Sequence, residues 1–120
     1  MIRNILLVAL GGGVGSVLRY LLSGINTSFP WGTFIVNILG SLLIGLLVGL
    51  VSKGILSPDM KLLLVTGFCC GFTTFSTFAN ESFGMMKSGD VLLAALYVGA
   101  SVAIGIFAVW LGMNISIDAD

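Results

Sequence analysis

The chain has 120 residues, of which 58% are apolar and only 8% charged, and its mean hydropathy is +1.17. This balance is far more apolar than that of a soluble domain and predicts an integral membrane protein. The five basic and five acidic residues cancel, so the chain offers no basic surface for nucleic acid.

Charged residues divide the chain into four apolar segments of about 20 residues, the length that a helix needs to cross a membrane. Short connections containing Pro, Gly, Ser and Asn separate these segments. We therefore predict an all-α, multi-pass membrane protein in which residues 1–120 form a single four-span domain. The expected spans are residues 4–22, 31–52, 62–83 and 91–113.

The basic residues give these spans almost no preferred orientation. An even number of spans places both termini on one side of the membrane. That side would contain Arg3, Lys53 and Lys61, and the other side would contain Arg19 and Lys87. Because Lys and Arg in short loops set orientation, this three-to-two bias leaves two alternatives. Either the chain inserts both ways up, or Lys53 and Lys61 fix a single orientation.

The third span contains the most unusual segment, residues 67–78, with the sequence GFCCGFTTFSTF. Hydrocarbon supplies no water to hydroxyl or backbone groups, so such a patch must be buried in protein or line a pathway. Gly71 weakens the helix just before the hydroxyl residues, which favours a local break that frees backbone carbonyls for a cation. The alternative is an unbroken helix whose hydroxyls bond to carbonyls four residues earlier.

Aromatic and cysteine side chains complete this segment. Phe75 and Phe78 are three residues apart, and their ring edges carry the positive part of the ring quadrupole. Cys69 and Cys70 are adjacent in a chain without histidine, so they give neither a zinc site nor a disulfide framework. We interpret both cysteines as small packing residues.

The second and fourth spans carry polar residues at four-residue intervals, which places them on one helix face. Such a stripe is typical of a contact between membrane helices, but the carboxamide of Asn37 in mid-span favours a functional role. In the fourth span, packing and function remain equal alternatives. The stripes are Thr33, Asn37, Ser41, Gly45 and Gly49, and then Tyr97, Ser101 and Gly105.

The first span places Gly11, Gly15 and Arg19 on one face, with Ser16 beside them. The small residues predict a close helix contact. Arg19 lies near the end of its span, so it either extends to the lipid headgroups or charges the mouth of an anion pathway. Glu81, which follows the polar patch near the end of the third span, either belongs to that patch or marks the solvated end of the span.

The polar groups inside the spans are donors of Asn, Ser and Thr together with Phe ring edges, and within the spans no carboxylate precedes Glu81. A small anion that loses its water needs such donors, whereas a cation needs oxygen acceptors. We therefore predict an anion pathway. An enzyme is excluded, because no base accompanies the Ser or Cys residues and no phosphate-binding loop is present. One four-helix unit encloses little space, which favours a homodimer.

Three ordered segments resemble a known family: residues 12–20 (GGVGSVLRY), 32–41 (GTFIVNILGS) and 67–78. Together they are similar to the Fluc (CrcB) fluoride channels of bacteria over essentially the whole chain. The resemblance implies an antiparallel, dual-topology homodimer with two pores in the bacterial inner (plasma) membrane, surrounded by lipid. Its expected function is passive export of fluoride from the cytoplasm, which relieves fluoride toxicity.

The resemblance also implies site residues. A structural sodium ion would lie at the dimer centre on backbone carbonyls of Cys70 and Thr73 from both subunits, and Cys70 stands where the family generally has glycine. Arg19 would be a vestibule arginine. The implied fluoride pore residues are Asn37, Phe75, Phe78, Ser76, Thr77, Tyr97, Ser101 and Thr33.

Two other functions compete with this interpretation. A small four-span drug exporter would need an acidic residue in the first span, which has none. A scaffold subunit would use the polar stripes only as helix contacts.

Overall fold

The computed structural model describes residues 1–27 and 29–118. All secondary structure in these residues is helical, and four segments are long and apolar enough to cross a membrane, which confirms the predicted fold class. The helices are α1 (Ile2–Leu22), the 3₁₀ helix η1 (Ser23–Ile25), α2 (Trp31–Ser52), α3 (Pro58–Lys61), the π-helix η2 (Leu62–Cys69), α4 (Cys70–Phe72), α5 (Ser76–Lys87) and α6 (Val91–Asp118).

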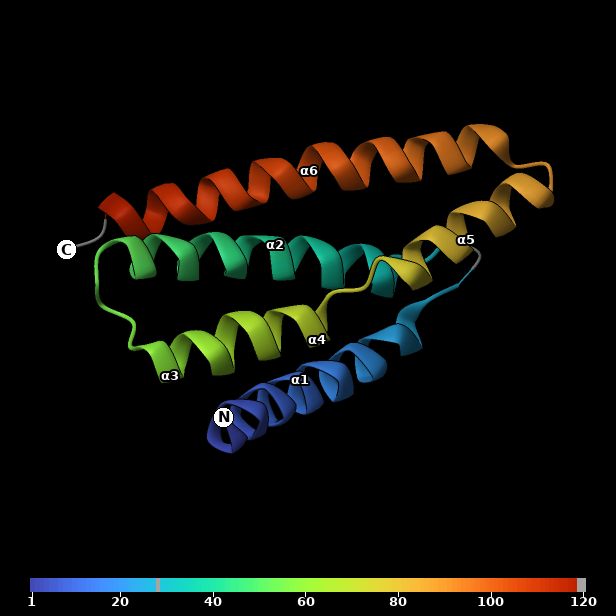
Figure 1. The fold of residues 1–120 in the computed structure, drawn as a ribbon. Helices are drawn as coiled ribbons and strands as arrows, with labels where there is room; N and C mark the ends of the chain where they lie inside the picture. The colour runs from blue at the N-terminus through green and yellow to red at the C-terminus, as the bar shows by residue number, and fades with distance from the viewer. Residues whose placement is uncertain (28, 119–120) are drawn as a thin grey trace.

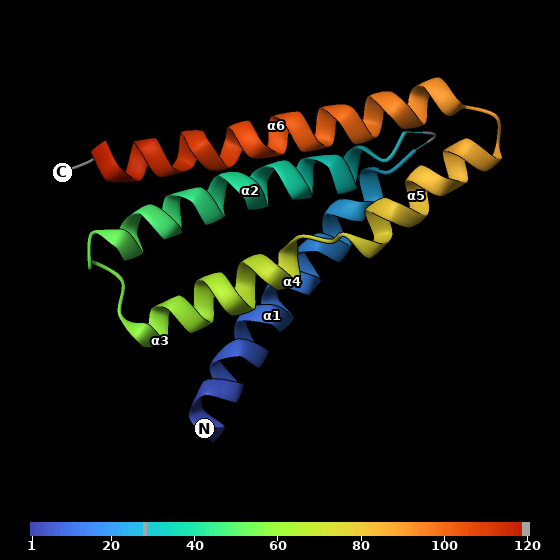
Figure 2. The same ribbon diagram turned by 45° about the horizontal axis from the view of Figure 1, so that its top comes forward.

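α2 and α6 lie side by side along the molecule (Figures 1 and 2). Glycines bring the two backbones together: a Cβ atom on Gly45 would overlap the carbonyl of Val109, and one on Gly112 would overlap that of Leu42. Backbone approach through small residues is typical of helix contacts in membranes. The glycine part of the stripe on α2 is therefore a packing seam.

α1 packs by the same means against the first half of the third span. A Cβ atom on Gly15 would overlap the carbonyl of Phe68, and one on Gly71 would overlap the carbonyl of Gly12. This confirms the close contact predicted for the small residues of α1. The amino end of α1 diverges from the other helices (Figure 2).

The third span is not one continuous helix. After the π-helix η2, α4 ends at Phe72, Thr73 adopts an extended conformation (φ −85°, ψ 160°), and α5 begins at Ser76. The break predicted near Gly71 is confirmed, and it lies directly after that glycine. The wide turns of η2 were not predicted from the sequence, and π-helical turns are frequent at functional sites.

The ends of the helices are joined by polar contacts at one end of the molecule. Arg3 near the start of α1 forms an ion pair with Asp59 of α3, and the Lys53 ammonium after α2 donates to the carbonyl of Ser116 on α6 (3.1 Å). The turn between α5 and α6 lies at the opposite end (Figure 1).

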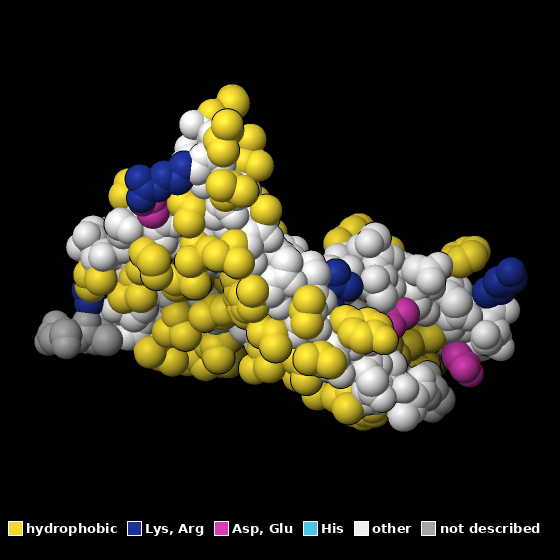
Figure 3. All heavy atoms as spheres, turned by 90° about the horizontal axis from the view of Figure 1, so that it is seen from below, with side chains coloured by type: hydrophobic (Ala, Val, Ile, Leu, Met, Phe, Trp, Pro, Cys, Tyr) yellow, Lys and Arg dark blue, Asp and Glu magenta, His cyan; other side chains and the backbone are white. Residues whose placement is uncertain are grey.

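The outer surface of the helices is largely apolar (Figure 3). Leu10, Val17, Ile106 and Trp110 are examples of large side chains that are more than half exposed. Only 11% of the most apolar stretch within residues 2–25 is buried inside the subunit. Such a surface needs lipid or another subunit against it, and the chain is a multi-pass membrane protein.

Candidate functional site

A cavity of about 360 Å³ lies beside the break in the third span. Its walls come from α2, from the residues around the break and from α6. Thus three of the four spans contribute to one site. Among the predicted site residues, those that line it are Asn37, Cys70, Thr73, Phe75, Phe78 and Ser101.

Asn37 of α2 is bonded to the broken segment through both ends of its carboxamide. Its Nδ2 donates to the Thr74 carbonyl (3.1 Å), and its Oδ1 accepts from the Thr74 N–H (2.9 Å). The N–H and the carbonyl of Thr74, which lose their helical partners at the break, are therefore both hydrogen-bonded. The other Nδ2 hydrogen has no acceptor among the described residues, so it is available to a ligand in the cavity.

Arg19 of α1 lies at the other side of the break. Its Nε donates to the Gly71 carbonyl (3.1 Å), and the Ser16 hydroxyl donates to the same oxygen (3.4 Å). Neither side chain lines the cavity. Arg19 is thus bonded to the carboxyl end of α4, a position that the sequence did not indicate.

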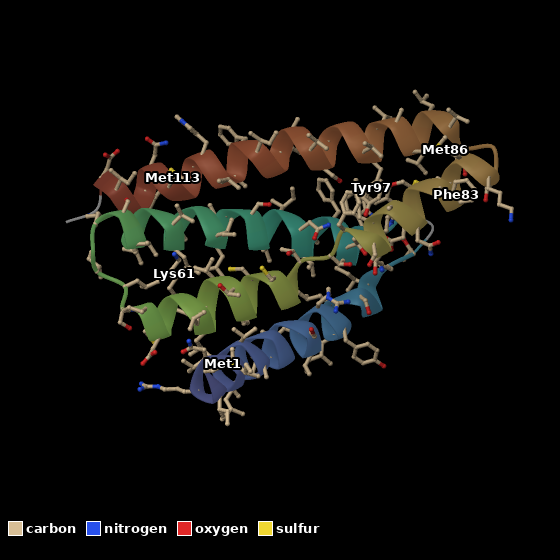
Figure 4. The ribbon with its side chains drawn as sticks, in the orientation of Figure 1. Met1, Lys61, Phe83, Met86, Tyr97 and Met113 are labelled. Atoms are coloured by element: carbon tan, nitrogen blue, oxygen red, sulfur yellow. The ribbon has the colours of Figure 1, made fainter. Side chains whose placement is uncertain are left out.

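Phe75 and Phe78 lie next to each other with their ring centroids 6.2 Å apart and their planes at 51°. Phe78 also packs against Tyr97 of α6 at 5.0 Å, and Tyr97 lies between α6, α2 and α5 (Figure 4). The ring of Phe75 lies beside Phe78 only on one side and is 79% exposed. One wall of the cavity therefore lies open on the surface of a single subunit.

Ser101 of α6 brings a hydroxyl to the same cavity. Its Oγ atom is buried and has no hydrogen-bond partner within the described part of the chain. Buried hydroxyls are nearly always paired, so this one is free to bond to a ligand. Ser101 is thus a buried polar group beside the cavity with an unused hydroxyl among the described residues.

Glu81 is the centre of a separate polar cluster. Its carboxylate accepts from the Thr33 hydroxyl (3.0 Å), the Tyr97 hydroxyl (3.1 Å) and Nδ2 of Asn26 (3.5 Å). Thr33 and Tyr97 are 4% and 1% exposed. Glu81 itself is half-buried and is hydrogen-bonded within the subunit. Thr33 and Tyr97 contact this carboxylate and do not line the cavity.

Asn26 was missed by sequence reasoning. Its Oδ1 accepts from the backbone N–H groups of Gly32 (2.7 Å) and Thr33 (3.2 Å), so it caps α2 from the preceding loop. The available signal was that α2 begins after Pro30, which has no capping side chain, with an Asn in the loop before it. Asn26 joins the start of α2 to the Glu81 cluster.

Ser76 and Thr77 are exposed on the first turn of α5 and lie outside the cavity. The backbone N–H of Thr77 is bonded to Thr74 Oγ1 (3.3 Å). These two predicted pore residues therefore lie on the face of α5 that the subunit leaves uncovered.

The break also frees backbone carbonyls. Those of Gly71 and Thr74 are occupied by side chains, whereas no donor among residues 1–27 and 29–118 reaches those of Cys70 and Thr73. Carbonyl oxygens of this kind are suitable ligands for a hard cation. Cys70 has φ −69° and ψ −32°, an ordinary helical conformation that needs no glycine.

Residues 6–113 match the family described as CrcB-like protein, Camphor Resistance (CrcB). The chain belongs to the CrcB family. The matched region includes every residue that we have placed at the cavity, at the break and in the Glu81 cluster. The resemblance seen in the sequence is confirmed.

Relatives of this CrcB chain are similar along nearly their whole length. Three proteins called "Fluoride-specific ion channel FluC" illustrate this. They come from Flavobacterium psychrophilum (46% identity, over 95% of this chain and 97% of the relative), Phocaeicola vulgatus (50%, over 95% and 98%) and Chlorobaculum tepidum (49%, over 93% of each).

Proposed function

We propose that this CrcB chain is a subunit of a fluoride-selective channel through which fluoride leaves the cytoplasm passively. The observation that carries this proposal is the identity of 44–50%, over at least 93% of the chain, to relatives named fluoride-specific ion channels. In a bacterial plasma membrane such a channel would relieve fluoride toxicity. No chemical reaction is involved.

The cavity beside the break supports an anion as the permeating species. None of its described lining residues is Asp or Glu. A strongly hydrated anion needs donors in place of its water, and the free Nδ2 hydrogen of Asn37 and the unpaired Ser101 hydroxyl supply two. The edges of Phe75 and Phe78 add weakly positive C–H groups. Once a second subunit closes the open wall, the donor spacing and the width of the site would discriminate against larger anions.

The other predicted pore residues take part less directly. Thr33 and Tyr97 would act through Glu81, to which both donate. Ser76 and Thr77 would continue the polar route along the exposed face of α5. Arg19 would lie near the entrance.

We infer that the channel is an antiparallel homodimer with two pores. Phe75 is 79% exposed, so the cavity has an incomplete wall in one subunit, and the apolar face of α1 has no partner there. A second copy would cover both surfaces with self-complementary contacts. The nearly balanced Lys and Arg residues are compatible with insertion in both orientations.

A sodium ion at the centre of this dimer is part of the proposal. The Cys70 and Thr73 carbonyls of both subunits would hold it, and the ion would neutralise carbonyl oxygens that otherwise face hydrocarbon unpaired. The support is that no donor from the described residues reaches these two carbonyls, whereas their neighbours Gly71 and Thr74 have donors.

Fluoride efflux from liposomes tests the channel directly. Purified protein is reconstituted, and external fluoride is followed with a fluoride-selective electrode. We expect rapid efflux from wild type, none above background from Phe75→Ile and Phe78→Ile, and normal efflux from Phe83→Ile, whose ring is exposed outside the cavity. Absence of wild-type efflux would overturn the channel, and normal efflux in both pore variants would overturn the ring-edge role.

Separate measurements test the assembly and the ion. The mass of the protein in detergent should correspond to two chains, and a monomer that transports fluoride would refute the dimer. Replacing sodium with N-methylglucamine during purification and assay should lower efflux. Unchanged efflux after complete exchange would remove sodium from the proposal.

A further inference from the structure

Two side chains hold the break in the third span, one from each side. Asn37 of α2 is bonded to the peptide of Thr74, which follows the break. Arg19 of α1, with Ser16 beside it, is bonded to the carbonyl of Gly71, which precedes it. Phe75, a proposed pore residue, follows these fixed points directly, so its position depends on both.

The chemistry of the contact suits a permanent structural bond. Gly71 lies in the last turn of α4, where carbonyls lack donors from the helix itself, and a cation is favoured at a helix carboxyl end. Guanidinium is always charged, and its Nε–H has a fixed direction. The Nε of Arg19 is 3.1 Å from the Gly71 oxygen, within normal hydrogen-bond range.

The backbone contact between α1 and α4 fixes the distance that the arginine spans. A Cβ atom on Gly71 would overlap Gly12, and one on Gly15 would overlap Phe68. The two helices therefore touch within two turns of Arg19. The spacing of their backbones sets the distance between Arg19 and the Gly71 carbonyl. A guanidinium placed mainly to attract anions would have no need of this bond.

We propose that Arg19 is a positioning residue of the pore, which acts through the Gly71 carbonyl to hold the broken end of α4 and thereby Phe75. This inference rests on the proposed channel function and deepens it. Arg19 contributes geometry to the fluoride route, in addition to any charge at its entrance.

The variants Arg19→Lys, Arg19→Gln and Ser16→Ala separate geometry from charge. Lysine keeps the charge but lacks the Nε–H, glutamine removes the charge, and Ser16→Ala removes only the second donor. Arg3→Gln is the matched control, because it removes a positive charge from the same helix at an exposed site far from the break. Ser16→Ala is the mildest change and serves if the arginine variants do not fold.

Hydrogen exchange of the backbone amides of residues 73–77 reports on the stability of the break, and the measurement needs no fluoride. We expect exchange to be faster by about fivefold or more in both Arg19 variants, by less in Ser16→Ala, and unchanged in Arg3→Gln. Unchanged exchange in both Arg19 variants and in Ser16→Ala would overturn the inference. Because this measurement does not depend on transport, it stands even if the protein carries no fluoride.

The salt dependence of efflux distinguishes positioning from attraction. Loss of position should lower fluoride efflux similarly in Arg19→Lys and Arg19→Gln, at both low and high ionic strength. A charge at an exposed mouth is screened by salt. Normal efflux in Arg19→Lys, with a defect in Arg19→Gln that disappears at high ionic strength, would refute the positioning role.

Discussion

The carboxamide of Asn37 bonds to the peptide of Thr74 through its nitrogen and its oxygen, at 3.1 and 2.9 Å. These residues are 37 positions apart in the chain, and the pair joins the middle of α2 to the break in the third span. The side chain supplies what a continuous helix would have supplied to Thr74. A broken helix at this depth is stable only because such partners exist.

Asn37→Ala should therefore weaken both the fold and the transport. It leaves the Thr74 N–H and carbonyl without partners, which costs about 1–3 kcal/mol for each buried group, and it removes a donor from the cavity. We expect a lower thermal midpoint in detergent and at least a tenfold loss of fluoride efflux, a magnitude typical of one lost buried bond. Asn114→Ala is the control, because Asn114 is exposed on α6 and bonds only to the Trp110 carbonyl. Equal behaviour of the two variants would contradict the role of Asn37.

Ser101→Ala should lower fluoride transport without lowering the stability of the protein. The Ser101 hydroxyl is buried and has no partner in the part of the chain that the structure describes, so its removal should leave the free energy of unfolding unchanged or raise it by up to about 1 kcal/mol. Fluoride efflux should nevertheless fall. Ser116→Ala, which removes a buried hydroxyl bonded to the Met113 carbonyl, should lose stability instead. A destabilised Ser101→Ala with normal efflux would show that this hydroxyl is structural.

Tyr97→Phe tests the cluster around Glu81. The ring keeps its contact with Phe78 at 5.0 Å, but the donor to the carboxylate is lost, and a hydrogen bond to a charged group is worth about 1.5–3 kcal/mol. We expect a clearly lower midpoint in thermal unfolding. Tyr20→Phe, at a residue that is 74% exposed, should have no effect. If the two variants melt alike, the bond between Tyr97 and Glu81 makes no net contribution.

The contact between α1 and the third span predicts opposite effects for two glycines of one helix. A Cβ atom on Gly15 would overlap backbone atoms, whereas one on Gly13 would meet nothing within 4 Å. Gly13→Ala should be neutral or stabilising by up to about 1 kcal/mol through helix propensity. Gly15→Ala should separate the helices and destabilise the protein. Similar unfolding midpoints for the two variants would contradict the close packing.

The four spans and the break could be predicted because their causes are local. Apolar length identifies membrane helices, and Gly71 before a run of hydroxyl residues marks a weak point in a helix. Asn37 was recognisable as unusual because a carboxamide in mid-span needs partners. Its partner was not predictable, since Thr74 is brought to it only by the packing of α2 against the broken span.

The Glu81 cluster shows the limit of pattern reasoning more clearly. Thr33 and Glu81 are 48 residues apart, and they meet because α2 and α5 converge near the loop that holds Asn26. Nothing in the spacing of either segment encodes that convergence. The same holds for Arg19, whose bond to Gly71 depends on how closely the glycines let α1 approach.

The break also has a consequence for how the chain enters the membrane during synthesis. It separates an apolar first half of the third span from α5, which carries the polar residues Ser76, Thr77, Asn80, Glu81 and Ser82. The third span has a mean hydropathy of 1.6 against 2.3 for α6. Within the subunit, Glu81 of α5 is bonded to Thr33 of α2 and to Tyr97 of α6. A nascent chain that ends before α6 lacks the Tyr97 partner of Glu81, so we expect α5 to enter the hydrocarbon only after the fourth span has been translated.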